Sequence, residues 1–224
     1  MSGIIVSYDG TPNDDDALAL GRLLARAGAP LALAYVRHSR EFDPGREELA
    51  QHDAERRLEH GASWLGDPDI PRHIVVSAST GAGLGKLAEE EGAALLVFGS
   101  DYRTPPGRVE PGTSAQRLLE GGSVAIAVAP AGLRTHADTT IASVAVGAGT
   151  EDPAAETTAR DLAAALGVDF TTSPTSTGLI VVGSQPGAPE GRVALGGATR
   201  NLLESTRAAV IVLPRGAALS LTGA

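Results

Sequence analysis

The chain contains no cysteine, and aromatic residues make up only 3% of its 224 residues. Absence of cysteine excludes disulfides and thiolate metal ligands, and it fits a reducing compartment. No apolar run approaches the roughly 20 residues that a membrane-spanning helix needs. The N-terminal MSGIIVSYDG lacks the basic region and the long apolar stretch of a signal peptide. We therefore expect a cytoplasmic protein that has no contact with a membrane.

Positive charge is also scarce. The formal net charge is −9, and Lys and Arg form no cluster. Because nucleic-acid binding depends on a basic surface that contacts phosphates, we expect no nucleic-acid partner. The sequence shows no constellation of a nucleophile with its base and no closely spaced pair of histidine metal ligands. We therefore expect no enzymatic activity, no catalytic residues and no metal site.

One segment occurs twice. Leu95–Pro130 and Leu179–Pro214 align without a gap at an offset of 84, with 15 of 36 positions identical. The identities include a glycine-serine pair at the end of an apolar strand and a Gly-Arg-Val triplet in the following loop. Core packing accepts many apolar substitutes, so it would not by itself preserve such residues. A loop that holds an anion would preserve them, and so would a shared backbone turn.

Apolar strands and amphipathic helices alternate through the first 130 residues, which predicts an α/β fold with a parallel sheet. We expect a Rossmann-like doubly wound sheet of strand order 3-2-1-4-5. The strands are expected at 4–8, 31–36, 73–78, 94–98 and 124–128. The helices are expected at 14–27, where Asn13 serves as the cap, and at 44–65, 84–91 and 113–120.

The remainder is expected to be a reduced copy of the same fold. Residues 1–130 form the first domain, residues 131–140 a polar linker, and residues 141–216 a shortened second repeat. Ile141–Val146 matches the first strand and Ala154–Leu166 the first helix. The short stretch that follows takes the place of strands two and three and their helices, so we expect the second repeat to lack them.

The last strand of each repeat is apolar, at Val124–Val128 and Ala209–Leu213. Both are apolar enough to be covered, and the family resemblance given below, in which two domains commonly pair through their fifth strands, implies that these two strands meet and that neither is left as an exposed edge. The chain would then contain a pseudo-dimer within itself. This arrangement leaves room for a further homodimer.

In an open α/β sheet, ligands bind outside the carboxyl ends of the strands, at the point where the strand order reverses. Asp9 follows the first strand, and Gly99 and Ser100 follow the fourth. The helix that opens with Gly112, Thr113 and Ser114 offers free backbone N–H groups and hydroxyls to phosphate. These residues predict a nucleotide or phosphate site, although turns and helix capping would account for them as well.

These motifs resemble those of the universal stress proteins, the family of UspA-like α/β domains, here in tandem form. Members that bind ATP carry G-x2-G-x9-G-[S/T] after the fourth strand. In this chain Gly99, Gly112 and Thr113 keep that spacing, and Tyr102 replaces the second glycine. The resemblance covers nearly all of the first 130 residues and two stretches of the second half.

The resemblance implies a stress-response protein that binds ATP or another adenine nucleotide in the first repeat. It places Asp9 at the adenosine, the backbone of Val36 at adenine, and Arg108 in the phosphate loop. Together with the residues named above, the implied nucleotide site is Asp9, Val36, Gly99, Ser100, Arg108, Gly112, Thr113 and Ser114.

The departures from the family pattern keep a second hypothesis open. Tyr102 lacks the φ freedom of glycine, and Asp101 brings a carboxylate toward the polyphosphate. Arg103 and Arg108 would compensate that charge. In the second repeat Ala148 replaces Asp9, and Gly197 replaces Thr113. The alternative is an interaction or scaffold protein of the same fold that binds no nucleotide.

Overall fold

The computed structural model describes residues 3–38, 43–135, 140–147, 152–173 and 178–222. The first half contains β1 (Ile4–Ser7), α1 (Pro12–Ala25), β2 (Leu31–Arg37), α2 (Pro44–Leu65), β3 (Arg72–Val76), α3 (Thr80–Glu91), β4 (Leu95–Phe98), α4 (Thr113–Leu119) and β5 (Ala125–Val128). A 3₁₀ turn, Leu133–Thr135, leads into the second half. There the elements are β6 (Ser143–Val146), α5 (Pro153–Leu166), β7 (Asp169–Thr171), β8 (Leu179–Val182), α6 (Gly197–Ser205) and β9 (Ala209–Val212).

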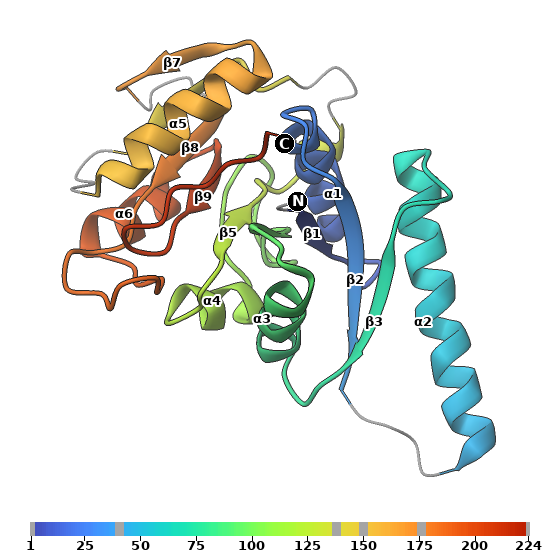
Figure 1. The fold of residues 1–224 in the computed structure, drawn as a ribbon. Coiled ribbons are helices and arrows are strands. Elements are labelled where there is room, and N and C mark those ends of the chain that lie inside the picture. Colours follow the sequence, from blue (N-terminus) through green and yellow to red (C-terminus); the bar gives the residue numbers. More distant parts are fainter. Residues whose placement is uncertain (1–2, 39–42, 136–139, 148–151, 174–177, 223–224) are drawn as a thin grey trace.

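Within the described residues the strands form one nine-stranded sheet of order β3-β2-β1-β4-β5-β9-β8-β6-β7 (Figure 1). The first half confirms the predicted 3-2-1-4-5 order, with parallel pairing throughout. β5 and β9 pair antiparallel, with Ala127 opposite Ile211. The prediction that the last strands of the two repeats meet is therefore confirmed.

The second repeat retains more of the fold than the sequence predicted. β7 pairs parallel with β6, the position that β2 takes beside β1. The expectation that the second strand is absent was wrong, because this strand is only three residues long and its single apolar residue, Phe170, gives no period to recognise. Nothing among the described residues corresponds to β3, α2 or α3 in this half.

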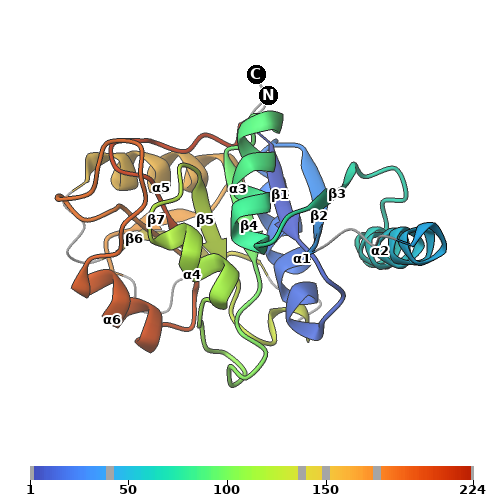
Figure 2. The same cartoon turned by 90° about the horizontal axis from the view of Figure 1, so that it is seen from below.

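Apolar side chains form one core on each face of the sheet. The core on one face contains Leu20, Leu24, Leu58 and Leu162, from α1, α2 and α5. The core on the other face contains Leu84, Leu119 and Leu203, from α3, α4 and α6. Figure 2 shows α4 and α6 side by side on that face, where the two halves meet. No helix among the described residues is long and apolar enough to cross a membrane.

α1 begins earlier than predicted. Thr11 is its N-cap and Pro12 its first residue, a position where proline loses no helical hydrogen bond. Asn13, which the sequence suggested as the cap, lies inside the first turn. Its side chain is therefore available for a contact outside the helix.

The linker that was predicted over residues 131–140 is held to α1 at its start. Asp16 is fully buried and accepts hydrogen bonds from Gly132 N at 2.8 Å and Arg134 N at 2.7 Å. The Arg134 guanidinium lies 2.7 Å from the same carboxylate. A buried carboxylate with this many donors is satisfied, so the chain leaves the first half along a fixed path.

Candidate functional site

The predicted site lies at the carboxyl ends of β1, β2 and β4, which we call the switch-point edge. β1 has β2 on one side and β4 on the other, with Val6 opposite Val97. The strand order reverses at this point, because the chain adds β2 and β3 on one side and β4 and β5 on the other. Parallel strands end at the same edge, so Asp9 and the β4–α4 segment are brought together as predicted.

Val36 presents its backbone at this edge. Tyr8 N donates to the Ala34 carbonyl at 2.9 Å, and on the other side of β2 Ser77 N donates to the Arg37 carbonyl. Backbone groups of alternate residues point to opposite neighbours, so Val36 faces the β1 side, two residues beyond Ala34. β1 has already ended there, and the described residues supply no backbone partner for Val36. Its side chain is buried in the core.

Asp9 and Asp14 lie together in the turn between β1 and α1. The Asp14 carboxyl accepts from Thr11 N at 2.9 Å, from the Thr11 hydroxyl at 2.7 Å and from Asp9 N at 3.3 Å. Burial raises the pKa of Asp14 to about 8, and the hydrogen bond and negative charge of Asp9 add to the rise. The backbone N–H groups of this turn therefore point at an acidic side chain, that of Asp14.

Arg57 reaches this turn from α2. Its guanidinium donates to the Asp9 carbonyl at 2.6 Å, pairs with Asp53 at 2.9 Å and lies 5.5 Å from the centre of the Tyr35 ring. Next to it the buried Tyr8 hydroxyl lies 2.7 Å from His60 Nδ1. Burial raises the pKa of Tyr8. These contacts fix the path of the chain that carries Asp9.

Gly99 contacts protein rather than an open site. A Cβ on Gly99 would lie 2.0 Å from the Asn13 carbonyl oxygen, so only glycine fits. A Cβ on Gly183, its counterpart in the second repeat, would lie 2.5 Å from the Asp152 side chain. Asp152 stands two residues after Thr150, the counterpart of Thr11 in the sequence, as Asn13 stands two residues after Thr11. In both repeats this glycine serves the packing of strand end on helix start.

Ser100 is buried and fastens the following loop. Its hydroxyl donates to the Ala129 carbonyl at 2.7 Å and accepts from Glu110 N at 3.2 Å. Ser184 does the same in the second repeat, with Leu213 and Ala194 at 2.7 and 3.0 Å. The repeated Gly-Ser pair is therefore explained by a shared backbone turn, one of the two explanations that the sequence left open.

Arg108 points to the junction between the halves. Its Nη1 donates to the Ser205 carbonyl, at the end of α6, at 3.0 Å. Arg192 Nη1 donates to the Gly121 carbonyl, just after α4, at 3.3 Å. The loops match as well, since Gly107 N and Gly191 N donate to the Ala131 and Arg215 carbonyls. The predicted role of Arg108 in holding phosphate does not fit this placement, because the guanidinium is engaged with the other half.

Gly112, Thr113 and Ser114 open α4 as predicted, with Gly112 as the N-cap. Asp101 lies beside them, with its Oδ2 3.9 Å from the position of a Cβ on Gly112. Tyr102 is 69% exposed, and the Arg103 guanidinium lies 4.9 Å from the centre of its ring. Two of the residues that break the family motif therefore lie in the loop before α4, with the carboxylate turned toward the helix start.

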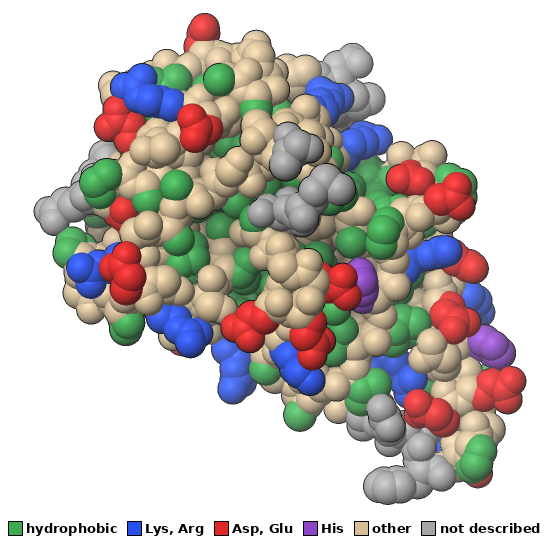
Figure 3. Space-filling model, viewed as in Figure 1, with side chains coloured by type: hydrophobic (Ala, Val, Ile, Leu, Met, Phe, Trp, Pro, Cys, Tyr) green, Lys and Arg blue, Asp and Glu red, His purple; other side chains and the backbone are tan. Residues whose placement is uncertain are grey.

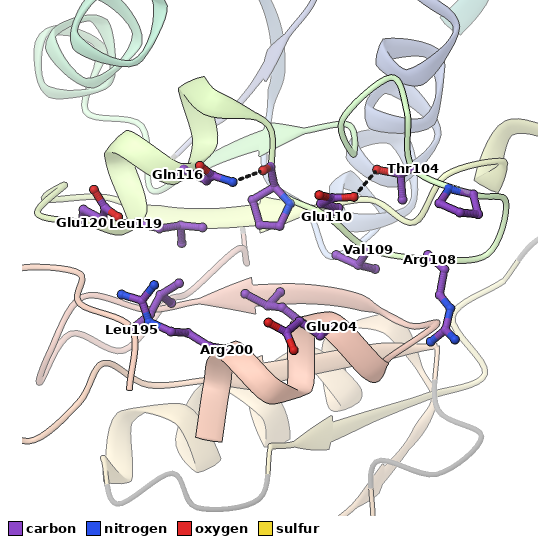
Figure 4. A pocket seen from close by; sticks show the side chains of 13 residues that line it. Thr104, Arg108, Val109, Glu110, Gln116, Leu119, Glu120, Leu195, Arg200 and Glu204 are labelled. Carbon is purple, nitrogen blue, oxygen red and sulfur yellow. Dashed lines mark hydrogen bonds between the residues drawn. The ribbon is translucent and has the colours of Figure 1, made fainter. Parts of the chain in front are cut away.

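A separate cavity of about 600 Å³ lies between α4 and α6 (Figure 4). Its walls come from equivalent positions of the two repeats, at an offset of 84: Leu119 with Leu203, and Glu120 with Glu204. Gln116, whose counterpart is Arg200, donates to the Pro111 carbonyl at 2.8 Å. No pattern in the sequence indicates this cavity, because it forms only when β5 and β9 pair.

Three residues of the edge were missed as site residues: Asn13, Asp14 and Arg57. Asn13 was interpreted as a cap, yet its side chain donates to the Ser100 and Asp101 carbonyls at 2.9 and 2.7 Å. No spacing rule relates positions so far apart in the chain.

Ala148, the counterpart of Asp9, lies outside the described residues. Among those described, no group of acidic or histidine side chains is arranged to hold a metal ion.

Comparison with known proteins shows the family. Residues 1–130 match the universal stress protein family, and the chain belongs to it. A universal stress protein from Archaeoglobus fulgidus DSM 4304 shares the fold, with a TM-score of 0.69 at 13% identity, over 96% of this chain and 100% of that chain. A functionally unknown protein from Pseudomonas aeruginosa PAO1 has a TM-score of 0.55 at 12% identity, over 96% and 93%.

A universal stress protein solved in complex with cAMP is 26% identical, over 42% of this chain and 69% of that chain, with a TM-score of 0.33. No curated protein sequence matches the chain. The structures from Archaeoglobus fulgidus DSM 4304 and Pseudomonas aeruginosa PAO1 each align with nearly all of this chain and show that they share its fold.

Proposed function

We propose that the protein binds an adenine nucleotide or nucleoside at the switch-point edge of its first half, as a stress-response protein without catalytic chemistry. The observation that carries the proposal is the backbone of Val36. Its N–H and C=O face outward beyond the end of β1, with no partner among the described residues. Adenine presents an adjacent donor and acceptor that such a pair of backbone groups can satisfy.

The position of Asp9 supports the same site. Asp9 is exposed at the end of the neighbouring strand, and Arg57 fixes its backbone. A carboxylate at this place can accept hydrogen bonds from ribose hydroxyls, as an acidic residue at a different position does in dinucleotide-binding α/β folds. Gly112, Thr113 and Ser114 lie at the same edge and complete the proposed contacts.

Titration calorimetry of the full chain with adenosine, AMP, cAMP, ADP and ATP tests the proposal. Saturable binding of any of them, at one site per chain, supports it. No heat from any of them at millimolar concentration would leave the interaction or scaffold protein as the better explanation. Location in the cytoplasm stays a prediction from the sequence.

A further inference from the structure

We propose that the cavity between α4 and α6, which we call the junction cavity, binds a small organic cation that carries an ammonium group on an apolar body. The cavity has a volume of about 600 Å³, and Asp9, Val36 and Thr113 of the switch-point edge lie outside its walls. The inference therefore does not depend on the proposed function. Small-molecule sites in proteins have volumes of about 300–1,000 Å³, so the junction cavity is large enough for such a ligand.

The floor of the junction cavity is apolar and comes from both repeats. Leu119 on α4 and Leu203 on α6 are buried, at equivalent positions of the two repeats. Val109, from the loop before α4, is buried as well, and Leu195, from the loop before α6, is half-buried. A ligand with a hydrocarbon body can bury its apolar surface against these side chains, which favours binding through the hydrophobic effect.

The rim of the junction cavity carries three exposed carboxylates. Glu110 and Glu120 belong to the wall of the first repeat, and Glu204 belongs to α6 in the opposite wall (Figure 4). Glu110 accepts a long hydrogen bond from the Thr104 hydroxyl, at 3.4 Å. Glu120 and Glu204 make no ion pair or side-chain hydrogen bond with the residues that the structure describes. These carboxylates are therefore available to a ligand.

Two guanidinium groups also line the cavity, but they do not balance the carboxylates. Arg108 is engaged with the Ser205 carbonyl at 3.0 Å. Arg200 stands one helical turn before Glu204 on α6, yet its guanidinium forms no ion pair with a carboxylate of the described residues. The lining thus keeps an excess of negative charge, which attracts a cation and repels an anion.

The ends of the two helices add to this negative potential. Glu120 is the C-cap of α4, and Glu204 is the last residue but one of α6. The C-terminal end of a helix carries partial negative charge, so a carboxylate at this position is unfavourable for the helix itself. A bound ammonium group near either carboxylate would relieve that repulsion. An apolar floor under an acidic rim fits a cation with an apolar body better than it fits an anion or a sugar.

Two compounds of similar shape and opposite charge test the ligand class: phenylbutylamine and phenylbutyrate, titrated into the full chain by calorimetry. We expect the amine to bind at one site per chain and at least about tenfold more tightly than the acid, because their charges are opposite. High salt should reduce this difference, since salt screens exposed charges. Equal affinity of the two compounds, or no binding of the amine at millimolar concentration, would overturn the proposal.

Variants of α6 locate the site. Glu204→Gln should weaken binding of phenylbutylamine about two- to fivefold, and Arg200→Gln should strengthen it by a similar factor, as expected for exposed charge pairs. Because both residues lie on α6, a general disturbance of that helix would change the affinity in the same direction in both variants.

Glu48→Gln is the matched control, because it removes an exposed carboxylate from α2, at the far edge of the molecule from α6 (Figure 2). It should leave the affinity for phenylbutylamine unchanged. A loss in Glu48→Gln as large as that in Glu204→Gln would show that the amine responds to the net charge of the chain. Unchanged affinity in both α6 variants would place the amine outside the junction cavity. Either result would overturn the proposal.

Discussion

Arg108 and Arg192 make equivalent contacts in opposite directions across the junction of the two halves. Arg108 donates to the Ser205 carbonyl and Arg192 to the Gly121 carbonyl, and the two acceptors are themselves 84 residues apart, like the arginines. Val193 N adds a bond to the Gly122 carbonyl at 2.8 Å. The repeated Gly-Arg-Val triplet is thus retained where the repeats hold each other, in a pseudo-twofold arrangement within one chain.

These arginine contacts predict a loss of stability. Arg108→Ala and Arg192→Ala should each lower the free energy of unfolding by about 0.5–1 kcal/mol, the range for an exposed hydrogen bond from a charged group to a carbonyl. Urea denaturation measures the loss. Arg200→Ala provides the control, because this arginine lines the cavity between α4 and α6 and its side chain makes no polar contact with the residues that the structure describes. A loss as large in Arg200→Ala would mean that the carbonyl bonds are not the reason.

Asp16 predicts a larger effect. Its buried carboxylate satisfies two backbone N–H groups and the Arg134 guanidinium, so Asp16→Ala leaves all three without their acceptor. Breaking a buried pair on one side costs about 3–5 kcal/mol, and the partial exposure of Arg134 places the expected loss near the lower end. Urea denaturation of Asp16→Ala should show it. Asp16→Asn, which keeps one acceptor, should lose less, and equal losses would contradict this account.

The alternation of apolar strands with helices and the internal identity predicted the fold class and the two repeats. The strand order followed from the usual order of doubly wound sheets, and the pairing of β5 with β9 followed from the family resemblance. β7 could not be predicted, since three residues give no period to recognise. The roles of Ser100, Gly99 and Arg108 were also beyond reach. An identity between the repeats indicates that a residue is needed. A turn, a close contact, an interface and a bound ligand would each preserve the residue in both repeats, so the identity does not tell them apart.

Asp14 shows a different limit of the sequence. Three consecutive aspartates at a helix start indicate favourable interaction with the helix dipole. Asp14 instead closes the turn, Asp15 lies 3.2 Å from the Tyr8 hydroxyl, and Asp16 is buried under the linker. Residues of one type in one run have three different environments, which only the packing of distant segments decides.

The environment of Asp14 predicts how stability depends on pH. Its pKa is raised from 3.8 to about 8 in the folded chain, chiefly by burial. Between these values the folded chain holds a proton that the unfolded chain releases, so this group makes stability fall as pH rises from about 4 to 8. The slope is at most about 1.4 kcal/mol per pH unit, and the contribution is lost above the folded pKa.

Urea denaturation at several pH values between 4.5 and 8.5 measures this dependence. Asp14→Asn cannot titrate and should make the stability profile flatter over this range than that of the unaltered chain. Asp161→Asn, with an exposed carboxyl, should leave the profile unchanged. An Asp14→Asn profile that falls as steeply as the original would show that other groups cause the dependence.

The two halves also predict asymmetric ligand binding. Asp9 lies at the switch-point edge of the first half, beside the seven-residue β2. In the second half the strand at the position of β2 has three residues, and Gly197 stands in place of Thr113. We therefore expect one ligand per chain. Loss of charge-assisted hydrogen bonds in Asp9→Ala should cost roughly 1.5–3 kcal/mol, about a tenfold to hundredfold loss of affinity.

Arg192→Ala is the matched variant for this prediction, because it alters the junction and lies away from the proposed edge. Its affinity for AMP, measured by calorimetry under conditions where it stays folded, should equal that of the unaltered chain. A stoichiometry of two would assign a working site to each half. Binding that survives Asp9→Ala and is lost in Arg192→Ala would move the ligand to the junction between α4 and α6, where the cavity already has the volume for it.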